Sequence, residues 1–535
     1  MLAADKSFDM RVEDSIAEVE NKSQELRPDV PIDPFDPHDP LSWSTSRKLT
    51  ILLVVGLWIL LGTSNMIIIA PALQIIPVEF HSSFDTSTYL VGGPLLAYGI
   101  SSFLWVPLGN RYGIRLVFVL SSLAAACMDC WAARATSFGS LVAARTLASM
   151  FYAPPETLAP QLVGDVFHFK NRAKAMTWIG ILQASGFSGG PLIGAFIIQN
   201  RALGWRWIEW ILAIITFGAA VLMIFLLPET QYTRYTMEAT TLTRSWKDDL
   251  RFWPVSGGGP PKEHRSGGIQ KPEAMGLLAD THYSVAHGLA TILPYFGHPV
   301  IILNTAFFSL TLLVTSYTLV FLLPSAMALK PNSRQTTQSI TYLAVYPFSV
   351  GNSGLTFIAP LIGTWLAMLF CGVLADRLFT RLTRKEGRKP KPERRLPLLI
   401  VTGVVGIGGS LLFGICTQEK CHWVAPLFGS CFVSFCFISS LSISFAYLLD
   451  VYEAKMDTVM VIDNGMKNLA AFGISYAIVP WNTSAGYTIP FAVMAVILLV
   501  AHLLMALVYF KGEEMRKWSA QHFESARTTH HGDAF

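Results

Sequence analysis

Residues 180–195 decide the fold, and they read G-I-L-Q-A-S-G-F-S-G-G-P-L-I-G-A. The segment lies inside an apolar run, which predicts a helix in a lipid bilayer, because an unpaired backbone group is costly in hydrocarbon. Gly186, Gly190 and Gly194 recur on one drifting helix face, where bare backbone lets another helix approach closely. Pro191 removes one intrahelical hydrogen bond and should bend the helix. The pattern predicts either simple tight packing or a bent contact at which two parts of a helix bundle move.

The composition of the chain indicates a polytopic membrane protein. Of the 535 residues, 52% are hydrophobic and only 14% are charged, whereas about 25% of the residues of a typical soluble protein are charged. The few cysteines of so long a chain do not make a disulfide scaffold. Cys416 and Cys421 nevertheless flank a short polar loop and could pair if that loop faces outward.

The motifs of nucleotide-dependent and metal-dependent enzymes are absent from the sequence. It has no G-x-x-x-x-G-K-[ST] loop, no H-E-x-x-H pair and no paired C-x-x-C set. The hydrophilic stretch over residues 228–297 is too short and too rich in Gly and Pro for a catalytic domain. We therefore predict that the chain is not an enzyme, needs no cofactor and no metal, and takes its energy from an ion gradient.

Hydropathy divides the chain into two sets of six spans around one long loop, because a span needs about 20 apolar residues. We predict a disordered cytosolic tail over residues 1–46, a six-helix bundle over 47–227, a central cytosolic loop over 228–297, a second six-helix bundle over 298–511 and a cytosolic tail over 512–535. The expected spans are residues 49–70, 88–109, 115–135, 138–164, 174–199 and 207–227, then 298–327, 346–374, 396–416, 422–449, 456–480 and 487–510.

Short segments of similar sequence in the two halves suggest that the six-span unit is duplicated. Residues 107–115, after the second span, resemble residues 372–377, after the eighth. Asp165 and Asp450 follow the fourth and the tenth spans in the same way. Transporters built from repeats show such internal symmetry. The predicted fold class is therefore all-α membrane, with twelve transmembrane helices in two pseudo-symmetric six-helix bundles.

Lysine and arginine predict the orientation, because they are enriched in cytosolic loops. Placing both chain ends in the cytosol puts most of these residues inside, including a basic run over residues 377–395. Beside a span, such a run is expected to attract the anionic lipid of the inner leaflet. Binding of RNA or of another partner is the alternative interpretation, and we expect no nucleic acid.

The loop after the eighth span carries the residues of a known signature. Residues 372–377 match G-x-L-A-D-R, with Gly372, Asp376 and Arg377 in place. On these residues the sequence resembles the major facilitator superfamily, which implies the two-bundle major facilitator fold and transport by alternating access. In this family the loop latches the two halves in one state through charge pairs near the cytosolic helix ends. The resemblance makes Asp450 the expected partner of Arg377.

The copy of this loop in the first half departs from the signature. Asn110 stands where the family has Asp, while the loop retains Arg111, Gly113 and Arg115. The resemblance implies a charge pair between Arg111 and Asp165 at the cytosolic end of the fourth span. The neutral Asn110 side chain leaves this first-half latch with one charge fewer than the signature provides.

Three further segments resemble the antiporters of this family. Residues 186–195 match G-x-x-x-G-P-x-x-G-G, a signature associated with antiport, except that Ala195 replaces the last Gly. Arg145 stands as in the signature R-x-x-Q-G of the fourth span, although the Gln and the Gly are missing here. The motifs G-W-R-W at residues 204–207 and P-E-T at residues 228–230 are similar to those of fungal twelve-span drug:proton antiporters.

Charged residues inside the predicted spans mark candidate sites, because a charge is costly within the bilayer. Arg145 and Glu156 lie about three turns apart on the fourth span and are predicted to share a face. Glu156 is either a proton-binding carboxyl whose affinity depends on desolvation and on Arg145, or half of a structural ion pair. Asp463 and Lys467 on the eleventh span can pair within one helix. They form either a second titratable or cargo-binding site, or a neutralised pair that lines water.

Other polar positions in the spans and loops receive simpler interpretations. Asp129 is expected near the outer surface and solvated, and Glu209 is expected to pair with Arg206 in an interfacial aromatic belt. Asn65 on the first span and Asn464 on the eleventh could form hydrogen bonds to cargo. Asn482 begins a glycosylation sequon in a short predicted outer loop.

These residues and the resemblance together predict a proton-coupled antiporter that exports small organic molecules such as drugs, toxins or secondary metabolites. A proton from outside would protonate Glu156 or a neighbour and weaken its pairing with Arg145. The alternatives are a proton symporter that imports a nutrient such as a polyamine or a sugar, and a transport-inactive membrane sensor. The expected partners are the organic cargo, protons and the lipid bilayer around a monomer. The expected location is the plasma membrane, with the vacuolar membrane as the alternative.

Overall fold

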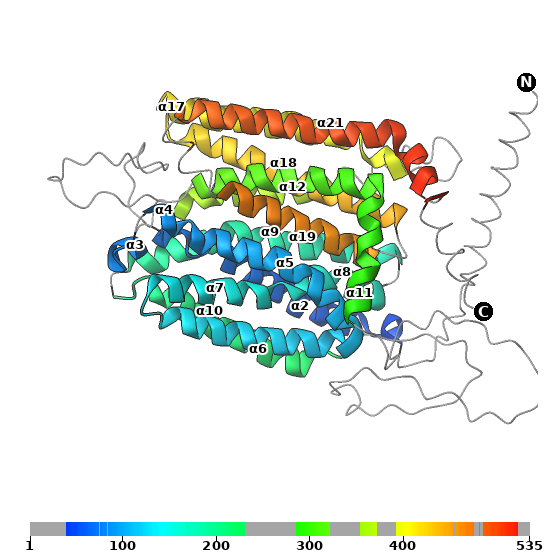
Figure 1. The fold of residues 1–535 in the computed structure, drawn as a ribbon, viewed down its shortest axis with the longest axis horizontal. Helices are drawn as coiled ribbons and strands as arrows, with labels where there is room; N and C mark the ends of the chain where they lie inside the picture. The colour runs from blue at the N-terminus through cyan, green and yellow to red at the C-terminus, as the bar shows by residue number, and fades with distance from the viewer. Residues whose placement is uncertain are drawn as a thin grey trace, which may run out of the picture.

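The computed structural model of the protein describes residues 39–73, 75–82, 84–167, 169–200, 202–230, 285–321, 354–371, 392–452, 456–475, 481, 485–519 and 521–522. Within these ranges every regular element is a helix and no strand occurs. Long helices lie side by side, and those of the first half of the chain pack together below those of the second half in Figure 1. The all-helical fold class predicted from composition is therefore confirmed.

The helices of the first half follow the predicted spans. They are α2 (Thr45–Ile67), α5 (Tyr89–Tyr112), α6 (Ile114–Ala133), α7 (Phe138–Tyr152), α8 (Pro154–Val166), α9 (Phe169–Gln199) and α10 (Arg206–Leu226). Short elements lie before and between them: η1 (Pro40–Ser42), η2 (Ala70–Ala72), α3 (Ile75–Glu79) and α4 (Phe84–Ser87).

The helices of the second half form the other group. They are α12 (Pro299–Phe321), α15 (Ile358–Leu369), α17 (Leu398–Gln418), α18 (Val424–Val451), α19 (Met456–Ser475) and α21 (Thr488–Ser519). The short helices α11 (Val285–Ile292), η4 (Leu293–Gly297), η5 (Leu355–Phe357) and η7 (Pro392–Arg395) precede or join them. Helix α11 lies in the stretch predicted as the central loop, and α21 runs past residue 511 to Ser519.

Length and hydropathy support a membrane position for this bundle. Nine helices in the described part of the chain are long and apolar enough to cross a bilayer. The other three predicted spans contain α7 with α8, α15 and α19, so the count of twelve stays a prediction. Large apolar side chains cover the outside, where Phe225 is 71% exposed and Phe510 is 78% exposed. An apolar exterior suits lipid, because hydrocarbon offers no partner to polar groups.

The fourth predicted span is two helices and not one. Helix α7 ends at Tyr152 and α8 begins at Pro154, with Ala153 between them. Neither Pro154 nor Pro155 has a backbone N–H to continue the hydrogen-bond ladder of α7, so the chain changes direction there. Residues before and after this break consequently do not share one helix face.

The glycine face of α9 packs against α2. A Cβ atom at Gly186 would collide with the side chain of Thr63 and the carbonyl of Leu60, and one at Gly194 would collide with the carbonyl of Ile68. The Ser64 hydroxyl also donates a hydrogen bond to the Gly186 carbonyl over 3.3 Å. Both helices belong to the first half, so these glycines serve tight packing within one half.

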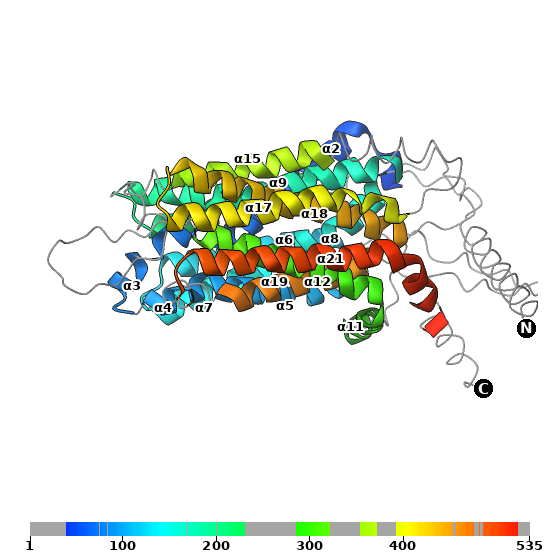
Figure 2. The ribbon, with the colours of Figure 1, turned by 90° about the horizontal axis from the view of Figure 1, so that it is seen from above.

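The two halves meet along several helix pairs, and Figures 1 and 2 both place α5 beside α19. A Cβ at Gly99 of α5 would lie 3.0 Å from the carbonyl oxygen of Gly465 on α19. Helix α8 also packs on α19, and α9 packs on α15 through another of its faces, where Trp365 donates to the Ser185 hydroxyl. The centre of the molecule is therefore lined by α5, α8, α9 and α19.

At the end of the bundle where α3 and α4 lie, Glu79 joins α3 to the start of α10 (Figure 1). Its carboxylate accepts a hydrogen bond from Nε1 of Trp205 over 2.6 Å and forms an ion pair with Arg206. The predicted pairing of Arg206 with Glu209 is therefore wrong. Partial burial opposes ionisation of Glu79, but the hydrogen bonds from Trp205 and Arg206 outweigh it and lower the pKa of this carboxyl.

We expect acid to loosen the contact between α3 and α10. Because the pKa of Glu79 is lowered on folding, its stabilisation is fully present above the ordinary value of 4.5 and is lost as the pH falls through the lowered value. Hydrogen–deuterium exchange of residues 75–82 should be slower in the wild type than in Glu79→Gln at neutral pH and equal to it in acid. A difference between the two proteins that persists unchanged in acid would contradict this assignment.

Candidate functional site

A buried ion pair joins the two halves at the centre of the molecule. Lys467 of α19 donates from Nζ to Glu156 Oε1 in the first turn of α8. The two side chains are 3% and 4% exposed. The Lys467 ammonium also donates to the side-chain oxygen of Asn464 over 2.7 Å. Charged groups this deeply buried persist in pairs, because an unpaired charge in a medium of low polarity is costly.

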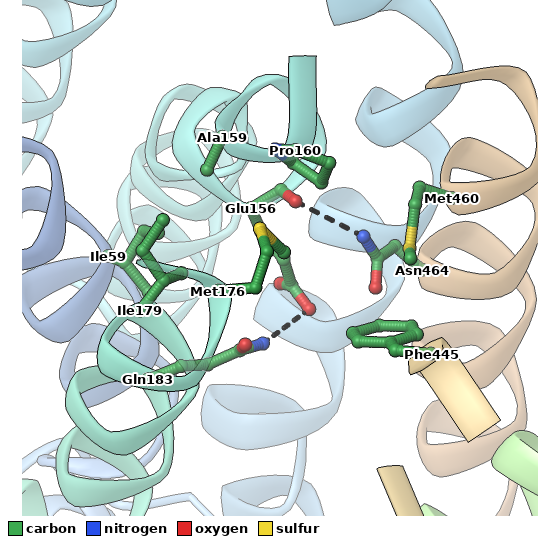
Figure 3. A pocket seen from close by; sticks show the side chains of 10 residues that line it. All are labelled: Ile59, Glu156, Ala159, Pro160, Met176, Ile179, Gln183, Phe445, Met460 and Asn464. Carbon is green, nitrogen blue, oxygen red and sulfur yellow. Dashed lines mark hydrogen bonds between the residues drawn. The ribbon is translucent and has the colours of Figure 1, made fainter. Parts of the chain in front are cut away.

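Two amides from different helices complete the surroundings of Glu156, as Figure 3 shows. Gln183 of α9 donates to the carboxylate over 2.6 Å, and Asn464 of α19 donates to the backbone carbonyl of Glu156 over 3.2 Å. That carbonyl is free of its usual partner because the residue four positions later is Pro160, which has no N–H. The prolines of α8 therefore expose a backbone acceptor at the boundary between the halves.

The same carboxylate borders a small pocket. Its lining combines the polar Glu156, Gln183 and Asn464 with apolar side chains from both halves: Ile59, Ala159, Pro160, Met176, Ile179, Phe445 and Met460 (Figure 3). The pocket leaves about 20 Å³ to the centres of water molecules, and about 10–15 Å³ is enough for one water. The site is thus closed in this conformation, and an organic cargo needs the halves to separate.

Two polar atoms beside this pocket have no hydrogen bond within the described part of the chain. They are Oε2 of Glu156 and the hydroxyl of Tyr98, which lies close to that carboxylate from α5. Buried polar atoms are almost always satisfied in folded proteins. The second carboxylate oxygen is therefore an acceptor that is available to a proton, a water or a cargo.

A second polar cluster lies one turn away on α19. Asp463 is 0% exposed and accepts hydrogen bonds from Nδ2 of Asn304, over 2.9 Å, and from the hydroxyl of Thr305, both on α12. Ser444 of α18 donates in turn to Asn304. The predicted pairing of Asp463 with Lys467 within α19 is not formed, because α8 brings the Glu156 carboxylate onto the ammonium and α12 satisfies Asp463.

A third cluster is enclosed by α2, α6, α7 and α10. Arg145 donates to the carboxylate of Glu209, with both side chains 0% exposed, and to the backbone carbonyl of Asn65 over 2.6 Å. Asp129 accepts from the Tyr152 hydroxyl over 2.6 Å and from the Asn65 amide over 3.3 Å. The cluster holds two carboxylates and one guanidinium inside the first half.

This cluster corrects three predictions made from sequence. Arg145 pairs with Glu209 and not with Glu156, because the break at Ala153 turns α8 away from the face of α7. Glu209 lies inside the half and not in an interfacial belt. Asp129 is fully buried and not solvated, because Asn65 and Tyr152 give it hydrogen-bond donors inside the bundle.

The first-half copy of the loop signature lies at the junction of α5 and α6. Gly113 takes a φ of 92°, a left-handed conformation that favours glycine. Asn110 accepts a hydrogen bond from Gln161 over 2.9 Å, and Arg111 lies over the ring of Tyr112. The neutral Asn110 therefore joins α5 to α8 through an amide pair.

Arg115 acts at the same junction as an anchor to α10. It is 1% exposed and donates to the carbonyl of Ile224 over 2.6 Å. Glu229 of the P-E-T motif accepts from the backbone N–H groups of Ile114 and Arg115 at the first turn of α6. A carboxylate at a helix N-terminus is stabilised by the free N–H groups and the helix dipole.

Several predicted positions lie outside the described residues. They are the second-half loop residues Gly372, Asp376 and Arg377, and the sequon residue Asn482. Asp450 is described and forms an ion pair with Arg395 over 2.8 Å, while the predicted pairs of Arg377 with Asp450 and of Arg111 with Asp165 stay predictions. Within the described ranges, no group of three His, Cys, Asp or Glu side chains is placed to hold a metal ion.

Gln183, Asn304 and Thr305 carry hydrogen bonds at the central sites and were not predicted from sequence. Gln183 lies in the middle of the span over residues 174–199, and a polar side chain at that depth is a signal of function in membrane proteins. Asn304 and Thr305 interrupt the apolar run of the seventh span in the same way. The signal was thus present, but it does not reveal which carboxylate each residue meets.

Comparison with known proteins places the chain among transporters. The sequence model of the Major Facilitator Superfamily matches residues 53–473. The chain is 27% identical to the transporter cpaT of Aspergillus oryzae over 426 residues, which are 78% of this chain and 77% of that protein. It is 24% identical over 472 residues to the multidrug transporter FLU1 of Candida albicans, covering 86% of this chain and 70% of that protein.

A solved structure supports the fold independently. The crystal structure of a D-xylose–proton symporter superposes with a TM-score of 0.57 at 13% sequence identity. The superposition covers 86% of this chain and 97% of the symporter. At this identity the likeness shows the fold and carries nothing about the cargo.

Proposed function

The chain belongs to the Major Facilitator Superfamily, and we propose that it is a proton-coupled antiporter that exports small organic molecules. The proposal rests on one observation, the buried ion pair between Glu156 and Lys467 that joins the two halves beside the pocket. The multidrug and efflux functions named for relatives in Candida albicans and Trichophyton rubrum support export as the direction. It follows from the proposal that one proton can break this ion pair between the halves.

Protonation of Glu156 removes the negative charge that holds Lys467 between α8 and α19. The neutral acid still accepts a hydrogen bond but no longer attracts the ammonium, so the contact weakens and the halves can separate. Entry of cargo needs the same carboxylate, since Glu156 is the acidic group that lines the pocket. A proton and a cargo that compete for one group cannot occupy it together, and such competition is what exchange requires.

Replacing Glu156 with glutamine should reduce pH-driven efflux at least about tenfold while the protein stays folded, because the amide cannot bind and release a proton. The measurement is flux of a fluorescent organic compound in liposomes that contain purified protein and an imposed pH gradient. Glu513→Gln is the matched control, because Glu513 is a half-exposed glutamate on α21 that pairs with Lys517. Undiminished pH-driven flux by Glu156→Gln would remove Glu156 from the mechanism.

A second variant separates loss of coupling from loss of folding. Glu156→Gln leaves Lys467 buried without its partner, which alone can destabilise the protein. The double variant Glu156→Gln with Lys467→Met removes both charges and should fold, yet it should still lack pH-driven flux. Movement of cargo in the same direction as protons, in the wild type, would instead identify a symporter that imports its cargo.

The membrane position is part of the proposal. The chain is a multi-pass membrane protein, and the excess of Lys and Arg in alternate loops supports cytosolic termini. We place it in the plasma membrane, with the vacuolar membrane as the alternative. Export of toxic compounds needs one of these two boundaries.

A further inference from the structure

Lys467 stands between two buried carboxylates and touches one of them. It forms an ion pair with Glu156 on α8, while Asp463 lies one turn back on its own helix. Residues four apart on a helix are neighbours, and the ammonium sits on a flexible four-carbon stem with three donors. A change of side-chain rotamer can therefore carry the charge of Lys467 from Glu156 to Asp463 without moving either helix.

The charges of this group balance only when it holds one proton. Glu156, Asp463 and Lys467 are all buried, so two ionised carboxylates and one ammonium leave an excess negative charge inside the membrane, which is costly. Asn304 and Thr305 of α12 face Asp463 and carry no charge. Lys467 is the charged group that interacts electrostatically with Asp463. On the far side of Lys467, Glu156 of α8 pairs with the ammonium, and Tyr98 of α5 lies close to that carboxylate.

The surroundings of Asp463 suit a neutral acid as well as a carboxylate. The Asn304 amide donates to Oδ2 in either state, while the Thr305 hydroxyl can donate to a carboxylate or accept from an O–H group. A proton on Asp463 is therefore held without any loss of hydrogen bonds. Asp463 can give up this proton when a positive charge arrives.

We propose that the cargo is an organic cation, and that its binding to Glu156 moves Lys467 onto Asp463, which releases a proton. This inference rests on the proposed exchange and names its substrate class. It differs in one step, because the exchanged proton is on Asp463 while Glu156 stays ionised and changes its cationic partner. Oε2 of Glu156 borders the pocket and, apart from the nearby Tyr98 hydroxyl, meets no donor in the described ranges, so it offers an acceptor to a cationic head. The aliphatic side chains, Phe445 and Met460 then enclose the apolar body, and Phe445 adds an aromatic face that attracts cations.

The exchange is balanced in atoms and charge. At the start Glu156 is ionised and paired with Lys467, and Asp463 carries its proton. At the end Glu156 is paired with the cargo cation, Lys467 is paired with ionised Asp463, and one proton has left for the aqueous phase. One positive charge enters the group and one leaves, so its net charge stays zero. Acid on the other side of the membrane reverses each step and expels the cation.

The test uses binding by purified protein, which requires no transport. The probe is N-methyl-phenylpyridinium, a permanent organic cation, and phenylacetate is the anionic comparison. In weakly buffered solution, binding of the cation should release about one proton, and its apparent Kd should rise about tenfold for each unit by which the pH falls. Binding of phenylacetate but not of the cation would overturn the cargo class.

Two variants of Asp463 test the route of the proton. Asp463→Asn has no proton to give and no carboxylate for the displaced Lys467, so it should bind the cation more weakly than the wild type and release no proton. Asp463→Glu keeps a titratable acid at this position and should still release about one proton. Proton release by Asp463→Asn, or its loss in a folded Asp463→Glu that binds the cation, would overturn the exchange of partners.

Failure of this inference is distinguishable from failure of the proposed function. If pH-driven efflux of another compound persists while the cation neither binds nor releases a proton, the antiporter stands and the cation mechanism is excluded. If the cation binds and releases a proton but no compound moves across the membrane in a pH gradient, the binding chemistry stands and transport is excluded.

Discussion

Replacing Glu209 with leucine is expected to destabilise the folded protein by about 3–5 kcal/mol, because the change leaves a buried guanidinium without its counter-ion. Arg145 and Glu209 are both 0% exposed, and the ion pair joins α7 to α10. The other donors of Arg145 meet the backbone carbonyls of Asn65 and Leu90. These neutral acceptors satisfy hydrogen bonds but do not balance the charge, and the Asp129 carboxylate of the same cluster is bonded to Tyr152 and Asn65 and not to the guanidinium.

The measurement is the midpoint of thermal unfolding of purified protein in detergent, taken at one scan rate because unfolding of such proteins is often irreversible. The matched control is the double variant Arg145→Met with Glu209→Leu, which removes both charges and keeps apolar volume. Replacing a whole buried pair by hydrophobic side chains is often neutral or stabilising, so the double variant should recover most of the loss. A single variant as stable as the wild type would show that Arg145 does not depend on Glu209.

The same cluster shows why hydropathy predicted the helices better than it predicted their contacts. Apolar length alone located the apolar part of every long helix described here, since the bilayer sets the length of a span. Hydropathy could not predict that Asp129 is buried. An average of hydropathy over a window of residues locates the end of a span only within a few positions. The stronger signal was the charge itself, which inside an apolar run marks the bundle interior by default.

Pairing predictions failed where they relied on spacing along one helix. Lys467 meets a carboxylate 311 residues away in sequence, and Arg145 meets one 64 residues away. The i,i+4 rule describes only neighbours on the same helix, so it cannot predict contact with a carboxylate on a facing helix. Arg145, Glu156, Asp463 and Lys467 were all identified as candidates from sequence, but their partners depend on how α7, α8 and α19 pack.

Adding one methyl group to the glycine face of α9 is expected to have opposite effects at neighbouring positions. Gly186→Ala and Gly194→Ala should each lower the stability by about 1–3 kcal/mol or more, because overpacking strains a filled contact. At Gly186 the new Cβ would lie 2.6 Å from the Leu60 carbonyl oxygen, and at Gly194 it would collide with the Ile68 carbonyl. Backbone atoms of α2 cannot move aside as a flexible side chain can, so the two helices must separate.

Gly189→Ala is the matched control on the same helix, because a Cβ there has no atom within 4 Å. In an open position alanine favours the helix over glycine by about 0.8–1.0 kcal/mol, so this variant should unfold at or above the wild-type midpoint. The expected change in the unfolding midpoint therefore has opposite signs at Gly186 and Gly189, which lie within a single turn of α9. Equal midpoints for Gly186→Ala and Gly189→Ala would mean that α9 does not lie against α2 through its glycines. In that case the close contact would have to form in another state of the transport cycle. The glycine face would then be a contact at which two parts of the bundle move, which is the alternative that the sequence predicts.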